Sequence, residues 1–262
     1  MAMARKHDPP RAPDWTALRR SWDEMQSLHL PKREARFAAI TEILSVALPS
    51  RFRALDVGCG TGSLSERVLA RCPKGRLVAI DHDPVLLAIG RHGLGSVGGR
   101  LTWVDADLRA SDWDRSLPAG RFDAAVSTTA LHWLHPAELR RFYRGLARRL
   151  RPGAIFLDGD SLPARPGSRS RIVRLAREIR HRRARDPGRE GAKPWSAWWR
   201  DVSREPGLAT EWAEHQRRYP HAHGNDPSSG LVLHRRALRA AGFREVGVLW
   251  QDLDDRVLVA IR

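Results

Sequence analysis

Short apolar runs alternate with segments of helical periodicity through the first 160 residues of the chain. The runs fall near 53–57, 76–81, 101–104, 122–127 and 154–158, and helices are predicted between them. Strands that alternate with helices in this way form a parallel sheet with both faces covered. Ligands of such sheets bind at the carboxyl ends of the strands. The pattern therefore predicts an α/β fold with a site at one edge of the sheet.

The segments that flank this alternation extend the same picture. Residues 15–48 have a helical pattern of apolar positions, whereas residues 1–14 are rich in proline and are expected to be disordered. Near the C-terminus, a helical pattern ends at Gly242, a residue type that commonly terminates helices. The apolar runs 246–250 and 257–261 follow, and we expect them to form a closing antiparallel pair.

Residues 160–233 interrupt the alternation with a segment of different composition. An apolar stripe at residues 172–179 predicts a helix whose other positions are largely arginine. Indole rings on one helix face line an aromatic pocket or pack as ordinary core, and both interpretations stay open here. Three indoles share one predicted helix face: Trp195, Trp198 and Trp199.

Three glycines alternate in the sequence LDVGCGTG of residues 55–62, directly after the first apolar run. Glycine lets a ligand approach the main chain, and the helix that follows begins with unpaired N–H groups. A dinucleotide-binding loop would need Gly-x-Gly-x-x-Gly, but position 63 is Ser. About 20 residues later the second run ends in Asp81, which is placed to accept hydrogen bonds from both hydroxyls of a ribose. These features predict a binding site for a ligand that contains a nucleoside and need not contain a diphosphate.

Five motifs, in this order and spacing, resemble those of the class I S-adenosylmethionine-dependent methyltransferases. They are 55–62, 80–84 (IDHDP), 104–108 (VDADL), 122–127 (FDAAVS) and 150–153 (LRPG). The run TALHWL after the fourth motif looks like the subgroup that contains trans-aconitate methyltransferase and the biotin-pathway malonyl-carrier methyltransferase. The resemblance covers the chain from near residue 40 to near 160, together with the C-terminal tail.

The resemblance implies a Rossmann-like fold, with a seven-stranded, mostly parallel sheet and helices on both faces. It implies S-adenosylmethionine (SAM) as the cofactor and S-adenosylhomocysteine (SAH) as the product. Residues 15–159 and 234–262 would form the SAM-binding core, with 15–48 as a helical cap on the cofactor pocket. Residues 160–233 would form a helical lid over the substrate.

Several motif residues are expected to contact the cofactor. Asp81 binds the ribose hydroxyls, although a carboxylate there also suits an N-cap of the next helix. By resemblance, Asp107 binds the adenine amino group, with Leu108 beside the ring. Arg36 pairs with the methionine carboxylate of the cofactor, unless it lies on an exposed helix face. The other expected cofactor residues are Asp56, which orders the loop or binds the methionine amino group, and Gly58, Gly60, Gly62, His82 and Ser127.

His132 follows the fourth predicted strand, at the sheet edge where this family carries out methyl transfer. Its ordinary pKa, near neutrality, suits a general base for an acceptor hydroxyl or amine, and packing against the cofactor is the alternative. Trp133 is expected to form a wall of the acceptor pocket. Arg174 would favour an anionic small-molecule acceptor and Trp199 an aromatic one, and the methylated atom (O, N or C) stays open.

The formal net charge is +16, from 46 basic and 30 acidic residues. The basic residues are mostly arginine and form no basic tail, so we expect a solvated surface, with an acidic ligand or partner as the alternative. Methylation of nucleic acid is a weaker alternative. Enzymes that methylate base amino groups carry an Asn/Asp-Pro-Pro-aromatic run, where this chain has Ser127 to Ala130. Neither Cys59 nor Cys72 suits a cytosine nucleophile.

The remaining features describe the setting of the protein. Two cysteines make no disulfide framework, which favours a reducing compartment, the cytoplasm. No apolar run approaches the ~18 residues of a membrane span, and the polar N-terminus is unlike a secretory signal. The histidines have no zinc-ligand spacing, so no metal is expected. A homodimer is compatible with the sequence. The alternative function on the same fold is SAM binding without methyl transfer, as in a cyclase or a ligand-sensing module.

Overall fold

The computed structural model describes residues 12–163, 170–184, 194–220 and 230–262 of the chain. Its strands are β1 (Arg53–Val57), β2 (Arg76–Asp81), β3 (Leu101–Asp105), β4 (Phe122–Thr128), β5 (Leu150–Ser161), β6 (Glu245–Asp252) and β7 (Asp255–Ile261).

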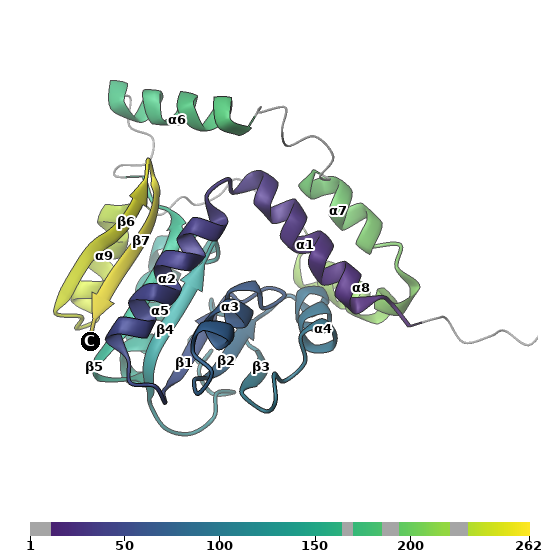
Figure 1. Ribbon diagram of the computed structural model, residues 1–262, viewed down its shortest axis with the longest axis horizontal. Helices are drawn as coiled ribbons and strands as arrows, with labels where there is room; N and C mark the ends of the chain where they lie inside the picture. The colour runs from purple at the N-terminus through teal and green to yellow at the C-terminus, as the bar shows by residue number, and fades with distance from the viewer. Residues whose placement is uncertain (1–11, 164–169, 185–193, 221–229) are drawn as a thin grey trace, which may run out of the picture.

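These strands form one seven-stranded sheet in the order β3-β2-β1-β4-β5-β7-β6 (Figure 1). β7 runs antiparallel to both of its neighbours, β5 and β6, and the other neighbouring pairs are parallel. The predicted α/β fold with a mostly parallel sheet is therefore confirmed, as is the antiparallel pair at the C-terminal end of the chain.

Helices cover both faces of the sheet, which explains why the central strands are apolar along their whole length. α2 (Arg33–Ala47) and α3 (Ser63–Arg71) pack on one face. α5 (Pro136–Arg149) and α9 (Leu231–Ala240) pack on the opposite face (Figure 1). α4 (Pro84–Gly93) follows β2 and contributes to the same layer as α2 and α3.

The helical pattern of residues 15–48 forms two helices instead of one. α1 (Trp15–His29) and α2 are separated by a turn that contains Pro31. Proline lacks a backbone N–H and its ring clashes with a preceding carbonyl, so a helix is interrupted there. Of the segment 1–14, expected to be disordered, all but the last three residues lie outside the described residues, and Asp14 caps α1 by accepting a hydrogen bond from a backbone N–H.

The described parts of the insertion between β5 and α9 contain α6 (Arg171–Ala184), α7 (Trp195–Val202) and α8 (Ala209–Arg218). Apolar side chains of α7, α1 and α4 form a buried cluster of their own, separate from the clusters on the two faces of the sheet. α8 also packs on α4. In contrast, α6 lies beyond the C-terminal end of β6 and contacts the core through Arg180 and Arg183, which pair with Asp254 and Asp252 (Figure 1). The polar loop that includes His221 and His223 lies outside the described residues.

Two short 3-10 helices, η1 (Leu131–Trp133) and η3 (Pro206–Leu208), complete the described helices. η1 directly follows β4 and carries residues that the sequence singled out. None of the helices in the described ranges is both long and apolar enough to cross a membrane.

Candidate functional site

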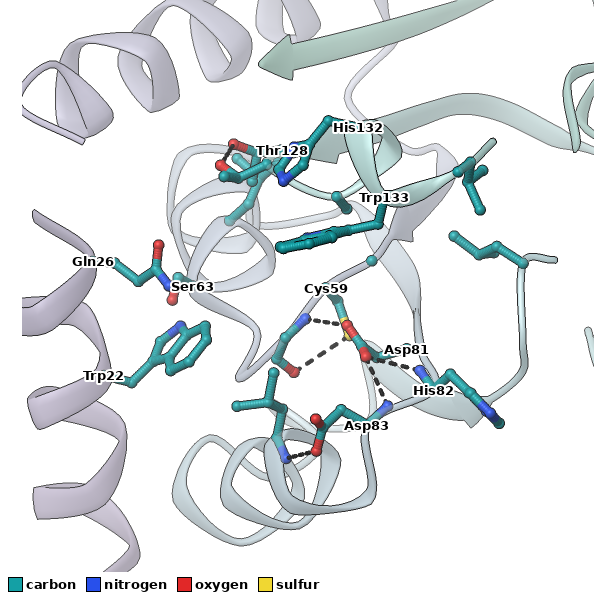
Figure 2. A pocket seen from close by; sticks show the side chains of 18 of the residues that line it. Trp22, Gln26, Cys59, Ser63, Asp81, His82, Asp83, Thr128, His132 and Trp133 are labelled. Atoms are coloured by element: carbon teal, nitrogen blue, oxygen red, sulfur yellow. Dashed lines mark hydrogen bonds between the residues drawn. The ribbon is translucent and has the colours of Figure 1, made fainter. Parts of the chain in front are cut away.

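A cavity of about 560 Å³ lies where β1, β2 and β4 end (Figure 2). Its walls come from the glycine loop after β1, the segments after β2, β3 and β4, and helices α1, α2 and α7. The chain just beyond α8 closes one side. The cavity therefore lies at the carboxyl edge of the sheet, as the strand order predicts, and it brings the core and the insertion together.

The glycine loop forms one wall of the cavity, to which Gly58 and Gly60 both contribute. Gly58 has φ +68°, and a Cβ there would lie 2.2 Å from the Cβ of Ala130, so only glycine fits. Gly62 does not line the cavity. Gly62 is the N-cap residue of α3 and has φ +82°. A Cβ at this position would lie 2.5 Å from the ring of Trp103. Gly62 thus shapes the loop from behind.

The carboxylate of Asp81 lies at the centre of this wall and accepts three backbone hydrogen bonds. The donors are the N–H groups of Gly60 (2.7 Å), His82 (2.8 Å) and Asp83 (2.9 Å). Burial, and next the charge of Asp83, raise the pKa of Asp81 to about 6. The N-cap of α4 is Asp83, which accepts from the N–H groups of the first turn, so the capping alternative for Asp81 is wrong.

His82, Asp107 and Leu108 line the side of the cavity next to β2 and β3, as the motifs predict. The Asp107 carboxylate accepts hydrogen bonds from the backbone and Nε of Arg109, at 2.9 and 2.8 Å. Burial would raise the pKa of Asp107, but these contacts and the charge of Arg109 hold it below its usual range. The guanidinium of Arg109 also lies 5.9 Å from the ring centre of Tyr219, which closes the cavity here.

Two residues at the end of α8 complete this side, and sequence reasoning missed both of them. Arg218 donates to the carboxylate of Asp105 (2.8 Å) and to the backbone carbonyl of His82 (2.7 Å). Tyr219 follows it and also lines the cavity. They lie in the insertion, where no motif of the core marks them.

His132 lies in η1 and lines the opposite part of the cavity, with Trp133 beside it (Figure 2). Its Nδ1 lies 2.9 Å from a carboxylate oxygen of Asp160, which is 1% exposed. Burial would raise the pKa of Asp160, but the charge and hydrogen bond of His132, and the charge of Arg36, together lower it. Sequence reasoning missed Asp160, because the apolar run of β5 ends at Asp158 and nothing in the pattern marks the later aspartate.

Aromatic side chains form much of the remaining cavity wall. Trp22 of α1 packs against the indoles of α7, with ring centres 4.9 to 6.3 Å apart. Trp198 is buried behind this cluster and donates its indole N–H to Ser21. The aromatic residues that line the cavity here are Trp22, Phe37, Trp133, Trp195 and Trp199.

Arg36 does not line the cavity, and it is not on an exposed helix face. Its side chain is 1% exposed and its guanidinium donates to Asp255 (2.9 Å) and Thr129 (2.7 Å). Arg33, almost one helical turn earlier, does line the cavity and pairs with Asp23 at 2.7 Å. Burial lowers the pKa of Arg33 although Asp23 opposes this effect. The two arginines share a helical pattern, so periodicity did not separate them.

Three other expected site residues also lie outside the cavity wall. Asp56 is fully buried, accepts a hydrogen bond from Ser65 Oγ at 2.6 Å, and has its pKa raised to about 7, chiefly by burial. Ser127 donates to the carbonyl of Val57 between β4 and β1. Arg174 lies on α6, away from the cavity.

The described residues contain no group of three His, Cys, Asp or Glu side chains that could hold a metal ion. His215 lies 2.8 Å from Asp83 and stacks on Trp199 and Trp212. His234 is buried, with its Nδ1 2.7 Å from the hydroxyl of Tyr143. Both histidines therefore have structural contacts that account for them.

Comparison with known proteins agrees with this geometry. Residues 54–153 match the family described as "Methyltransferase domain". The chain is 31% identical over 137 residues to trans-aconitate 2-methyltransferase of Azoarcus sp. (strain BH72), covering 52% of this chain and 49% of that protein. It is 26% identical over 163 residues to malonyl-[acyl-carrier protein] O-methyltransferase of Paenibacillus sp. (strain JDR-2), covering 61% and 56%. The chain thus spans about half the length of the curated relatives it matches.

Solved structures with this fold are more distant in sequence. A putative O-methyltransferase from Nostoc punctiforme superposes with a TM-score of 0.55 at 12% identity, covering 99% of this chain and 63% of that one. At this identity the similarity supports the fold alone. Together, the matched family and the curated relatives identify residues 54–153 as a methyltransferase domain.

Proposed function

We propose that this protein transfers the methyl group of SAM to a small-molecule acceptor and releases SAH. The observation that carries the proposal is one cavity that joins the main chain of Gly58 and Gly60 and the carboxylate of Asp81 to the imidazole of His132. When bound, SAM supplies an electrophilic methyl group. An acceptor held in line with that group in the same cavity gains much of its rate from proximity alone.

We assign the nucleoside of the cofactor to the side of the cavity next to β2 and β3. Asp81 accepts hydrogen bonds from the ribose hydroxyls, for which its ionised form is needed. His82 and Leu108 flank the adenine, and Asp107 accepts a hydrogen bond from its amino group. The three backbone donors to Asp81 support this role, because they fix the carboxylate at the cavity wall.

We assign the methionine carboxylate of the cofactor to Arg33 in place of Arg36. The support is that Arg33 lines the cavity and Arg36 does not. In this arrangement Asp56, Gly62 and Ser127 act from behind the wall, where they hold the loop that the cofactor contacts.

We propose an aromatic acceptor that carries a hydroxyl group. Five aromatic side chains from α1, α2, α7 and η1 line the cavity, including Trp199, whereas Arg174 does not reach it. Offset or edge-on contacts with such rings favour a planar ligand over an aliphatic one. This supports the aromatic alternative over the anionic one.

In this proposal His132 accepts the proton of the acceptor hydroxyl. Asp160 holds Nδ1, so the proton arrives at Nε2 as the oxygen forms its bond to the methyl carbon. The ionised carboxylate of Asp160 then stabilises the imidazolium that results. Asp160 is accordingly a positioning residue, and His132 is the catalytic one.

The test is SAH release from the full chain with SAM and a panel of phenolic and aliphatic carboxylate acceptors. We expect SAH only with an acceptor, and a matching gain of one methyl group in its mass. His132→Asn should lower kcat about 100-fold or more while SAM binding is retained. His181→Asn, on the exposed face of α6, is the matched control and should be silent.

Two outcomes would reject the proposal. Methylthioadenosine formed without an acceptor would indicate a cyclase, and absence of SAM binding in a folded protein would exclude the cofactor. Full activity in His132→Asn would be consistent with methyl transfer but would show that His132 is not the general base.

We also place the protein in the cytoplasm. Both cysteines, Cys59 and Cys72, are buried and unpaired, which supports a reducing compartment. Reporter fusions followed by fractionation would test this location.

A further inference from the structure

One face of the sheet is left uncovered at its edge. α9 packs on one face of β6 and β7, whereas on the other face α2 packs against β7 and leaves part of β6 exposed. A groove of about 580 Å³ lies there, between α2 and the two strands. It is mainly apolar, and two of its lining side chains are unusually exposed, Val46 at 84% and Leu249 at 67%. Apolar sheet faces are normally covered by helices, and here the helical layer is incomplete over β6.

α6 has the opposite property, because it is a helix without a sheet to cover. Its apolar stripe is exposed at Ile172 (77%), Leu175 (54%) and Ile179 (39%). Seven large apolar side chains are exposed in the described chain, and five of them belong to either this stripe or the groove. Isolated exposed apolar residues need no explanation, but two clusters of this kind indicate binding surfaces.

The two surfaces carry opposite charges. α6 contains six arginines and one glutamate. Glu42 and Glu245 are the only charged residues among those described that line the groove, and no basic residue lines it. An acidic groove is unexpected on a chain with a net charge of +16. Complementary charges of this kind steer association and select the partner.

The surfaces also match in length. The groove follows α2 from Ala39 to Ala47, which is about 12 Å at the rise of an α-helix. The stripe of α6 extends from Ile172 to Ile179, or about 10 Å. A helix whose side chains at i, i+3 and i+7 enter an apolar groove is a common mode of recognition.

α6 cannot fill the groove of its own chain while its observed contacts last. Arg183 pairs with Asp252 at 2.6 Å and Arg180 with Asp254 at 3.2 Å, which holds α6 beyond the C-terminal end of β6. The groove extends along β6 from Trp250 to Glu245, so its far end lies roughly 25 Å from Asp252 along the strand.

We propose that the protein forms a homodimer in which α6 of each copy occupies the α2–β6 groove of the other. β6 is the edge strand of the sheet; the groove follows it from Glu245 to Trp250, and α6 lies beyond its C-terminal end. A two-fold axis that crosses β6 therefore brings the two surfaces together twice, in a closed dimer. The interface lies outside the catalytic cavity and does not depend on the proposed reaction.

The experiment is sedimentation equilibrium of the full chain between about 1 and 200 μM, with two variants that each damage one surface. Leu175→Asp alters α6 and Leu249→Asp alters the groove. The wild type should approach twice its 29.5 kDa mass, and each variant should dimerise at least about tenfold more weakly, because each loses both contacts. Val232→Asp, which changes an exposed apolar residue of α9 outside both surfaces, is the matched control and should dimerise normally.

An equimolar mixture of the two variants provides the sharpest test. The groove of Leu175→Asp and the α6 of Leu249→Asp are both intact, so the mixture should form a heterodimer through one good contact. Raising the salt concentration should weaken the wild-type dimer, because the pairing has a charged component.

Several results would overturn the proposal. They are a wild type that stays monomeric throughout, variants that dimerise as the wild type does, and a mixture that remains monomeric. A wild-type mass that grows beyond the dimer would mean an open head-to-tail chain in place of the closed dimer. SAM binding and circular dichroism of each variant confirm that it is folded.

Discussion

At the scale of single residues, the state of the Asp81 carboxylate decides what the cavity can bind. Burial raises its pKa to about 6, while three backbone N–H groups favour its ionised form. A carboxylate that must accept hydrogen bonds from two hydroxyls works only when it is ionised. The proposed cofactor site is therefore sensitive to pH close to neutrality.

We expect the affinity for SAM to fall as pH drops through about 6. Below that pKa, protonation of Asp81 removes an acceptor, and the dissociation constant should rise by up to tenfold per pH unit. Calorimetric titration from pH 5 to 8 measures this. Asp81→Asn should bind weakly at every pH and show a flat profile, whereas Asp112→Asn, on the surface, should behave as the wild type. A wild-type affinity independent of pH would remove Asp81 from the ribose site.

At the scale of elements, the end of α8 connects the insertion to the side of the core where we propose that the cofactor binds. Arg218 reaches Asp105 after β3 and the main chain of His82 after β2, and Tyr219 follows it into the cavity wall. The Asp105 contact raises the pKa of Arg218 above its already high value, so the guanidinium stays charged. This contact couples the position of α8 to the proposed nucleoside pocket.

Arg218→Ala should raise the dissociation constant for SAM by about tenfold, because it releases Tyr219 and the loop at His82 together. Arg217→Ala is the matched control. Arg217 is exposed and, among the described residues, pairs with Glu214 alone, so this substitution should change the affinity for SAM very little. Calorimetry with SAM compares the two variants. Equal affinities would mean that α8 does not support the cofactor site.

The elements of the core could be predicted, because strand and helix periods in the sequence report directly on which faces are buried. The glycine loop and Asp81 were found for a related reason, since the spacing of one motif implies a particular turn. Asp160, Arg33 and Arg218 could not be assigned in this way. Their roles depend on contacts with residues far along the chain, such as the 28 positions between His132 and Asp160.

The insertion shows the same limit on a larger element. The apolar stripe of α6 predicted a helix, and the helix is present. Sequence periodicity identifies the apolar face of a helix but does not show what covers that face. In α6 the apolar face is exposed to solvent. The prediction that Arg174 contacts the acceptor required α6 to face the cavity, and sequence periodicity gives no information about the direction in which a helix faces.

At the scale of the whole molecule, the cavity is completed by parts of the chain that are distant in sequence. The core supplies the loop and strand ends, and the insertion supplies Trp199 and Tyr219. A ligand that contacts both parts should stabilise their association by mass action, by about 2.7 kcal/mol at 100 times its dissociation constant.

Saturating SAM should therefore slow tryptic cleavage after Arg217 and Arg218 at least about fivefold, because local opening of α8 becomes less frequent. α6 provides an internal control, since it is rich in arginine and lies outside the cavity. Mass spectrometry of the fragments over time follows both sites in one reaction. Equal protection of α6 and α8 would indicate a general stabilisation instead of a local one.

The tryptophan cluster around Trp22 also gives the protein a spectroscopic property. Trp22, Trp195, Trp198 and Trp199 have ring centres 4.9 to 6.3 Å apart, close enough for their electronic transitions to couple. Three of the four border the space proposed for the acceptor. Near-ultraviolet circular dichroism and intrinsic emission of the unlabelled chain should then change when a compound enters that space. The search for its acceptor can begin as an optical screen, before any turnover is detected.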